Sequence, residues 1–150
     1  MGVPRKQAYW DEYFIEMAEF VSTKSKDPST KYGAVIVRPD HTVAATGYNG
    51  FPRGMLDNKE FYENRTIKYQ RTIHCEMNAV LTAREPVAGY TLYIWQGISC
   101  DRCAPHMIQA GITRVVYPKL ETGYSKRWAE EIKTSIANFK EAGVEVVEHK

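Results

Sequence analysis

The sequence predicts an α/β fold of three layers, α/β/α, in which helices cover both faces of a five-stranded mixed sheet. Helical and extended patterns alternate along the chain, with turn residues between them. In the first half a short turn joins two extended runs, which requires an antiparallel pair. In the second half a helix joins two strands, which requires a parallel pair. With 150 residues, 43% of them hydrophobic, we expect one domain over residues 1–150.

The first half of the chain is predicted to form one amphipathic helix and one hairpin. Residues 10–23 place apolar side chains at helical spacing, and the pattern stops at the Lys-Asp-Pro sequence of residues 26–28. Residues 32–37 and 42–48 are short apolar runs. Because proline and aspartate lie between them, the two runs indicate antiparallel strands joined by a turn.

The middle of the chain begins with a long irregular segment. Residues 47–58 contain repeated glycine, proline and asparagine, and residues 59–71 are polar without a clear pattern. A loop of this length in a compact domain is often functional. Residues 73–84 return to helical spacing, and residues 91–96 have the composition of a strand.

The last third completes the alternation of helices and strands. Residues 100–110 are predicted to form a helix with Ser99 as its N-cap, and residues 114–117 a strand. A final helix is predicted at residues 128–142 and a final strand at residues 144–147.

Composition argues against several classes of function. The net charge is +2 and no run of Lys or Arg is present, so we expect no nucleic-acid partner. No stretch approaches the roughly 20 apolar residues of a membrane span, and the N-terminus lacks the apolar region of a signal peptide. Two of the three cysteines form a Cys-x-x-Cys pair, which favours metal or redox chemistry over disulfides. We therefore expect a cytoplasmic protein, or a host-cytoplasmic one if a virus encodes it.

Four residues form the most informative pattern in the chain. His74, Cys100 and Cys103 are three candidate zinc ligands, and Glu76 is an acid that need not bind the metal. On the predicted helix, Cys100 and Cys103 lie three residues apart and share one face. The positive ends of the two predicted helices favour thiolates and attract the carboxylate. One imidazole and two thiolates leave the fourth tetrahedral position of a zinc ion to water, which is typical of a catalytic site.

This pattern predicts a hydrolytic deaminase. Hydroxide formed at zinc would attack an amidine-like carbon, while Glu76 carries a proton from the water to a ring nitrogen and to the leaving ammonia. Three alternatives stay open: a redox pair, which would not need His74; a structural zinc with Glu76 as fourth ligand; and a zinc-stabilised binding module without catalysis. We expect Cys75 to be a small buried residue rather than a ligand.

The motif and its flanks resemble deoxycytidylate deaminases, within the zinc-dependent cytidine and deoxycytidylate deaminase superfamily. The resemblance covers nearly the whole chain. It rests on the segments at residues 25–31, 33–37, 47–54, 74–79 and 109–112. Two residues depart from the usual pattern, since Ser99 stands where the superfamily has proline and Cys75 where it has alanine.

The resemblance implies a cytidine deaminase-like fold and the hydrolysis of dCMP to dUMP and ammonia, which supplies dUMP for thymidylate synthesis. It implies a catalytic zinc held by His74, Cys100 and Cys103, with Glu76 as the catalytic proton shuttle. Because every cysteine lies in or beside this motif, we expect one zinc per chain. The resemblance also implies that Asn49 holds the sugar hydroxyl. The backbone N–H of Cys75 would contact the carbonyl group of the base.

Further expectations concern phosphate recognition and regulation. A 5′-phosphate needs cationic or hydroxyl donors, and the candidates are Ser25, Lys26, Ser29, Tyr124 and Arg127. The family is typically hexameric, activated by dCTP and inhibited by dTTP, with Mg²⁺ accompanying the triphosphate. The candidate regulatory residues are Gly47, Asn49, Gly50, Arg53 and Asp57.

Other substrates remain alternatives within the superfamily, namely dCTP, a free nucleoside, a tRNA base or a riboflavin precursor. A tRNA-modifying enzyme would be expected to show a basic face, for which this sequence gives no sign.

Overall fold

A mixed sheet of five strands forms the middle layer of the fold. The computed structural model describes residues 2–119 and 126–149. The strands are β1 (Gly33–Val37), β2 (Val43–Tyr48), β3 (Thr91–Trp95), β4 (Arg114–Pro118) and β5 (Glu145–His149). Their order is β2-β1-β3-β4-β5. Strand β1 pairs antiparallel with β2 and β3, whereas β3, β4 and β5 run parallel.

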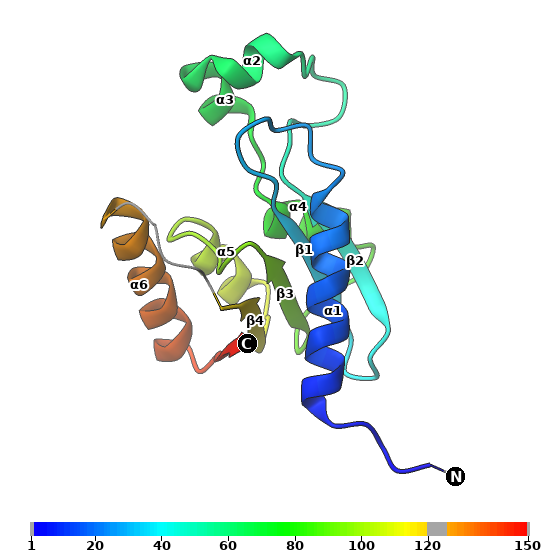
Figure 1. Cartoon of the computed structure of the whole chain (residues 1–150). Coiled ribbons are helices and arrows are strands. Elements are labelled where there is room, and N and C mark those ends of the chain that lie inside the picture. The colour runs from blue at the N-terminus through cyan, green and yellow to red at the C-terminus, as the bar shows by residue number, and fades with distance from the viewer. Residues whose placement is uncertain (1, 120–125, 150) are drawn as a thin grey trace.

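Helices cover both faces of this sheet. They are α1 (Gln7–Ser22), α2 (Lys59–Glu63), α3 (Arg65–Arg71), α4 (Cys75–Thr82), α5 (Cys103–Gln109) and α6 (Lys126–Glu141). Helix α1 lies on one face and α4, α5 and α6 on the other, while α2 and α3 extend from one end of the molecule (Figure 1).

The burial of β1 explains the layers. All five of its residues are buried, and their side chains alternate between the two faces. Val35 and Val37 pack with Phe14 of α1. Ala34 and Ile36 belong to the core on the opposite face, which α4, α5 and α6 complete. The predicted three-layer α/β fold with a five-stranded mixed sheet is therefore confirmed.

Most predicted elements are present, with shifted ends. The strands begin and end within two residues of the prediction. Helix α1 begins at Gln7, earlier than the predicted residue 10. The segment at residues 59–71, which had no clear pattern, forms α2 and α3. Asn64 separates these helices, because its side chain accepts a hydrogen bond from Ile67 N–H and so caps α3.

Helix α4 is shorter than predicted, and this changes the position of His74. Ile73 and Gly50 form an antiparallel bridge through two backbone hydrogen bonds of 2.8 and 3.1 Å. This pairing holds the chain extended, so the helix begins only at Cys75. His74 is the N-cap residue, with φ −70° and ψ 157°, and only Glu76 lies in the first turn as predicted.

The predicted start of α5 at Cys100 is also wrong. The N–H groups of Cys103 and Ala104 both bond to the carbonyl of Cys100, so a tight turn precedes a helix that begins at Cys103. Arg102, and not Ser99, occupies the N-cap position. Ser99 is fully buried, and its hydroxyl has no hydrogen-bond partner among the described residues.

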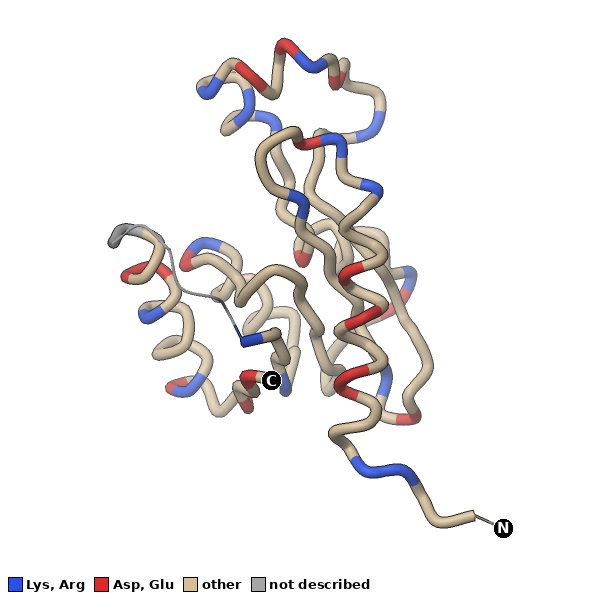
Figure 2. The backbone as a smooth tube through the Cα atoms, viewed as in Figure 1, with Lys and Arg blue, Asp and Glu red and all other residues tan. Residues whose placement is uncertain are grey.

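Helix α1 carries acidic residues only, whereas α2 and α3 together carry charged residues of both signs (Figure 2). Within the described ranges, no helix has the length and apolar content that crossing a bilayer requires.

A buried ion pair holds α1 on the sheet. Arg114 of β4 donates two hydrogen bonds of 2.7 Å to the carboxylate of Asp11, and Tyr93 donates a third. The two charged side chains are 15% and 5% exposed. Burial alone would raise the pKa of Asp11, but the hydrogen bonds from Arg114, Gln7 and Tyr93 outweigh it and lower that pKa.

Replacing Arg114 by methionine is expected to cost about 3 kcal/mol of stability at pH 7, because it leaves a buried carboxylate without its partner. The folded-state pKa of Asp11 lies below its unfolded value, so the pair stabilises the fold above about pH 4 and loses this effect as the pH falls further. The cost should therefore shrink at low pH. Urea denaturation at several pH values measures it.

The matched control is Lys59→Met, which removes an exposed ion pair with Glu63 and should cost less than about 0.5 kcal/mol. Equal costs for the two variants would show that the Asp11–Arg114 pair does not stabilise α1 on the sheet.

Candidate metal centre and active site

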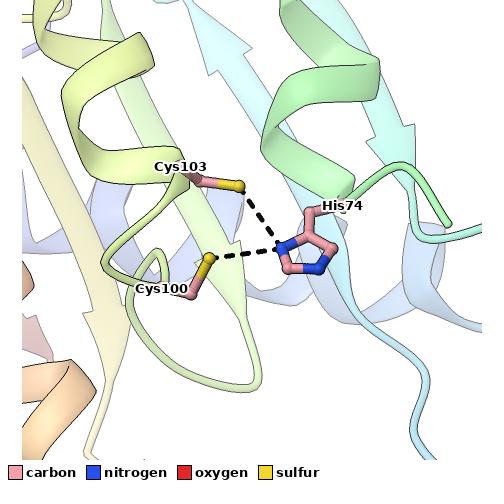
Figure 3. A group of neighbouring side chains, drawn as sticks. All are labelled: His74, Cys100 and Cys103. Carbon is pink, nitrogen blue, oxygen red and sulfur yellow. Dashed lines mark hydrogen bonds between the residues drawn. The ribbon is translucent and has the colours of Figure 1, made fainter. Parts of the chain in front are cut away.

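Three metal-ligating side chains converge where α4 and α5 begin. Nδ1 of His74 lies 3.3 Å from Sγ of Cys100 and 3.3 Å from Sγ of Cys103 (Figure 3). The donor atoms of all three residues lie within 4.8 Å of one another. The structure thus brings together residues that are up to 29 positions apart in the sequence.

These donors fit a zinc ion. Bonds of about 2.3 Å to sulfur and about 2.0 Å to nitrogen at tetrahedral angles put such ligands about 3.5 Å apart, close to the separations in the site. Both cysteines are buried, whereas His74 is exposed. In the described part of the chain, no other group of three His, Cys, Asp or Glu residues has this geometry.

Glu76 lies beside this cluster but does not belong to it. Its side chain is only 3% exposed. Burial raises the pKa of Glu76, and the nearby His74 imidazole partly offsets this rise. A raised pKa brings a carboxyl closer to the pH range in which it can exchange protons, which suits general acid and base catalysis.

The cysteines differ in their surroundings. The pKa of Cys100 is lowered, because the Cys103 thiol and the His74 ring stabilise its thiolate. The pKa of His74 is raised, first through its contact with Cys100. Burial instead raises the pKa of Cys75 well above its usual value, and its side chain belongs to the apolar core. Cys75 is therefore a buried core residue and only its backbone is adjacent to the site.

Gly47 lets α4 approach β2 very closely. A Cβ atom at residue 47 would lie 2.4 Å from the carbonyl oxygen of Cys75 and 2.5 Å from the backbone nitrogen of Ala79. No side chain fits in this space. Asn78 adds a hydrogen bond of 2.7 Å from its side chain to the carbonyl of Tyr48. The predicted regulatory residue Gly47 is thus a packing contact that sets the position of α4.

Asn49 is buried and its side chain is bonded to its neighbours. The amide nitrogen donates to the carbonyl of Thr30 at 3.0 Å and to Asp27 at 3.4 Å, and the amide oxygen accepts from Tyr32 N–H at 2.8 Å. Ser25 is also buried, and its hydroxyl donates to the backbone carbonyl of Asn49 at 2.8 Å. Two predicted substrate contacts are therefore packed together beside the bridge that precedes His74.

The remaining predicted residues are more exposed. Lys26 forms an ion pair of 2.7 Å with Asp57, so a candidate phosphate contact and a candidate regulatory residue touch each other. Ser29 lines a cavity of about 210 Å³ together with Arg65 and Lys68. Arg53 is exposed in the turn after Gly50 and Pro52.

Two candidates cannot be placed beside the cluster. Tyr124 lies outside the described residues. Arg127 belongs to the first turn of α6, but its side chain also falls outside the described part of the chain.

Sequence reasoning missed two residues of this region, Asp27 and Lys68. Asp27 is 3% exposed and accepts hydrogen bonds from Ser29 N–H and from the ammonium group of Lys68. An Asp two positions before the N–H it binds is a recognisable turn signal. Nothing in the sequence indicated the partner, because Lys68 lies 41 residues away on a segment without a clear pattern.

Comparisons with known proteins agree with this geometry. A family model described as the cytidine and deoxycytidylate deaminase zinc-binding region matches residues 8–119. An uncharacterised deaminase of Aliivibrio fischeri is 41% identical over 137 residues, covering 91% of this chain and 91% of that protein. The deoxycytidylate deaminase of Mus musculus is 34% identical over 143 residues, covering 90% of this chain and 76% of that protein.

A solved structure has the same fold. The crystal structure of dCMP deaminase from the cyanophage S-TIM5 in apo form has a TM-score of 0.72 at 25% identity, over 96% of this chain and 99% of that chain.

Gly47→Ala should displace α4 and with it His74 and Glu76. We expect a loss of about 3 kcal/mol in stability, at the upper end for overpacking, because backbone atoms of α4 must move. The zinc content of the purified protein should fall as well. Denaturation and metal analysis measure the two effects.

Gly50→Ala is the matched control, since its added Cβ would meet only the Tyr62 hydroxyl at 3.7 Å. If both alanine variants keep the zinc content and stability of the parent, the close approach at Gly47 does not position the site.

Proposed function

The chain belongs to the cytidine and deoxycytidylate deaminase family, and on this premise we propose that it hydrolyses dCMP to dUMP and ammonia. The observation that carries the proposal is a set of three metal donors next to a buried carboxyl group that is not one of them. A structural zinc site would use all four positions for protein ligands, most often Cys and His.

His74, Cys100 and Cys103 would hold one zinc ion per chain. Zinc bound in this way supplies a Lewis acid that lowers the pKa of a coordinated water to about 7.

Glu76 would move the protons. Its carboxylate takes a proton from the water that attacks C4 of the cytosine ring and delivers it to the ring nitrogen N3. It then carries the second proton to the amino group, which leaves as ammonia while the C4 carbonyl forms. The burial of Glu76 supports this role, because it raises the pKa of a carboxyl group that must first accept and then donate a proton.

We propose that Asn49 holds the sugar hydroxyl and that the backbone N–H of Cys75 contacts the base carbonyl. The position of Cys75 as the first residue of α4 supports this role, because N–H groups of a first helical turn have no partner within the helix. Phosphate recognition would use the candidate residues Ser25, Lys26, Ser29, Tyr124 and Arg127.

Regulation is the second part of the proposal. We propose that dCTP activates and dTTP inhibits the enzyme, with Mg²⁺ bound to the triphosphate, in a hexamer. The proximity of Lys26 and Asp57 supports communication between the phosphate and regulatory regions. The three free cysteines fit a reducing compartment, so we place the protein in the cytoplasm.

Glu76→Gln should retain zinc and fold but lose about 10³-fold in the rate of ammonia release from dCMP, because it removes both proton transfers. Metal analysis should give one zinc per chain in the parent and in the variant. A steady-state ammonia assay measures the rate.

Full activity of the variant would remove Glu76 from the mechanism. A parent protein that binds zinc but releases no ammonia from dCMP, CMP, dCTP or deoxycytidine would instead support the non-catalytic zinc module.

The same assay with deoxycytidine tests phosphate recognition, and we expect its kcat/KM to be at least about 100-fold below that of dCMP, since it lacks the group that charged donors bind. Adding dCTP with Mg²⁺ should raise the rate at low dCMP concentration, and adding dTTP should lower it. Equal rates on both substrates would contradict phosphate recognition, and rates unchanged by either triphosphate would contradict regulation.

A further inference from the structure

The side-chain amide of Asn49 has a fixed orientation. Its nitrogen faces two acceptors, the carbonyl of Thr30 and the carboxylate of Asp27, and its oxygen faces a donor, the N–H of Tyr32. Acceptors on one side and a donor on the other decide which end of the amide is nitrogen. Reversing the amide would break all three hydrogen bonds.

This orientation determines how many further hydrogen bonds the Asn49 amide can form. An amide nitrogen has two hydrogens, and both have partners. An amide oxygen has two lone pairs, and the described residues supply a donor for one of them, from Tyr32. Asn49 can therefore accept one more hydrogen bond, and a sugar hydroxyl is a donor of the required kind.

Asp27 is more than a turn residue. Its Oδ1 closes the turn by accepting from Ser29 N–H at 2.8 Å, a task that a neutral side chain can also perform. Its Oδ2 lies 3.4 Å from the amide nitrogen of Asn49 and 3.0 Å from the ammonium group of Lys68, which also donates to Oδ1 at 3.1 Å. The second oxygen thus links Asn49 to α3.

Lys68 pairs with this carboxylate in the interior. The two side chains are 4% exposed for Asp27 and 19% for Lys68. A buried carboxylate is costly unless it is paired and hydrogen-bonded, and Lys68 supplies both the opposite charge and hydrogen bonds. Without Lys68, Asp27 would be free to leave the position in which its Oδ2 accepts from the amide nitrogen of Asn49.

The location of this network ties it to the metal centre. Asn49 precedes Gly50, whose backbone pairs with Ile73, and Ile73 directly precedes His74. Only the two residues of the bridge, Gly50 and Ile73, therefore separate Asn49 from the predicted zinc ligand His74.

We propose that Asp27, held by Lys68, is a positioning residue that orients the Asn49 amide so that its oxygen accepts the 3′-hydroxyl of the deoxynucleotide. The inference rests on the proposed function, since dCMP carries no other hydroxyl on its sugar ring. It assigns to α3 a part in substrate selection.

The test combines Lys68→Met with a substrate that lacks the 3′-hydroxyl, 2′,3′-dideoxycytidine 5′-monophosphate. In the parent enzyme the kcat/KM of this substrate should be about tenfold below that of dCMP, because the substrate lacks the donor of one hydrogen bond to Asn49. In Lys68→Met the kcat/KM for dCMP should fall by about tenfold through KM, while the dideoxy substrate changes little. The ratio between the two substrates should therefore approach one.

Lys68→Arg should restore most of the parent ratio, because it restores the cation. Lys59→Met, on the neighbouring helix α2, is the matched control and should leave the ratio unchanged. A ratio in Lys68→Met equal to that of the parent would overturn the proposal, since a merely structural pair lowers activity on both substrates alike.

NMR provides a readout that does not depend on turnover or on one variant. The Asn49 side-chain amide protons, assigned with Asn49→Ser, should exchange slowly in the parent and at least about tenfold faster in Lys68→Met and in Asp27→Asn. Unchanged exchange in both variants would refute the positioning role. A parent protein with protected amide protons but no turnover of dCMP would overturn the proposed function and the sugar assignment while confirming the orientation of the amide.

Discussion

The site depends on how closely α4 packs against β2. At Gly47 the two backbones approach to a distance that excludes any side chain. Shortly after β2, the bridge between Gly50 and Ile73 holds the chain before α4 extended. Together these contacts determine where α4 begins. Because His74 is its N-cap and Glu76 lies in its first turn, the same contacts place a candidate metal ligand and a buried carboxyl group next to each other.

The second helix start supplies the two cysteines under a different constraint. Cys100 lies in a turn and Cys103 begins α5, so the two sulfurs reach one point from different local conformations. Parallel pairing of β3 with β4 places the connecting helix on the face that α4 also occupies. The candidate metal site therefore lies where the N-terminal ends of α4 and α5 come together on one face of the sheet. The opposite face, covered by α1, is secured by the Asp11–Arg114 pair and contributes none of the three donors.

Three buried polar residues form one network beside the bridge that precedes His74. Asp27, Ser25 and Asn49 are each 3–4% exposed and are joined by hydrogen bonds, which is a costly arrangement unless every polar group has a partner. Such a network restricts the orientation of its members more than an apolar contact does. This property is useful where an amide must present its oxygen rather than its nitrogen.

By itself the sequence determined the layers of the fold, the antiparallel pairing of β1 with β2, the parallel pairing of β3 with β4 and the identity of the candidate donor residues. Periodicity of apolar residues is a local property, and the spacing of His74, Glu76, Cys100 and Cys103 can be read without coordinates. For this reason the predicted strand ends lie within two residues of the observed ones. Local signals also misplaced the starts of α4 and α5. For α4 the reason is that Ile73 has helical spacing but is held extended by Gly50, which lies 23 positions away, and a periodic pattern does not reveal such pairing.

Only the tertiary structure decided which polar residues surround the cluster and in what orientation. Gly47 looked like a loop glycine and is a contact between backbones, and Lys68, on a segment without a pattern, became the partner of Asp27. Such assignments depend on distances between segments far apart in the chain. Burial, which requires the whole fold, then decides that Glu76 is desolvated and that Asn49 has one acceptor site left. The sequence therefore determined which chemical groups are available, and the packing of α3 and α4 decided how they are presented.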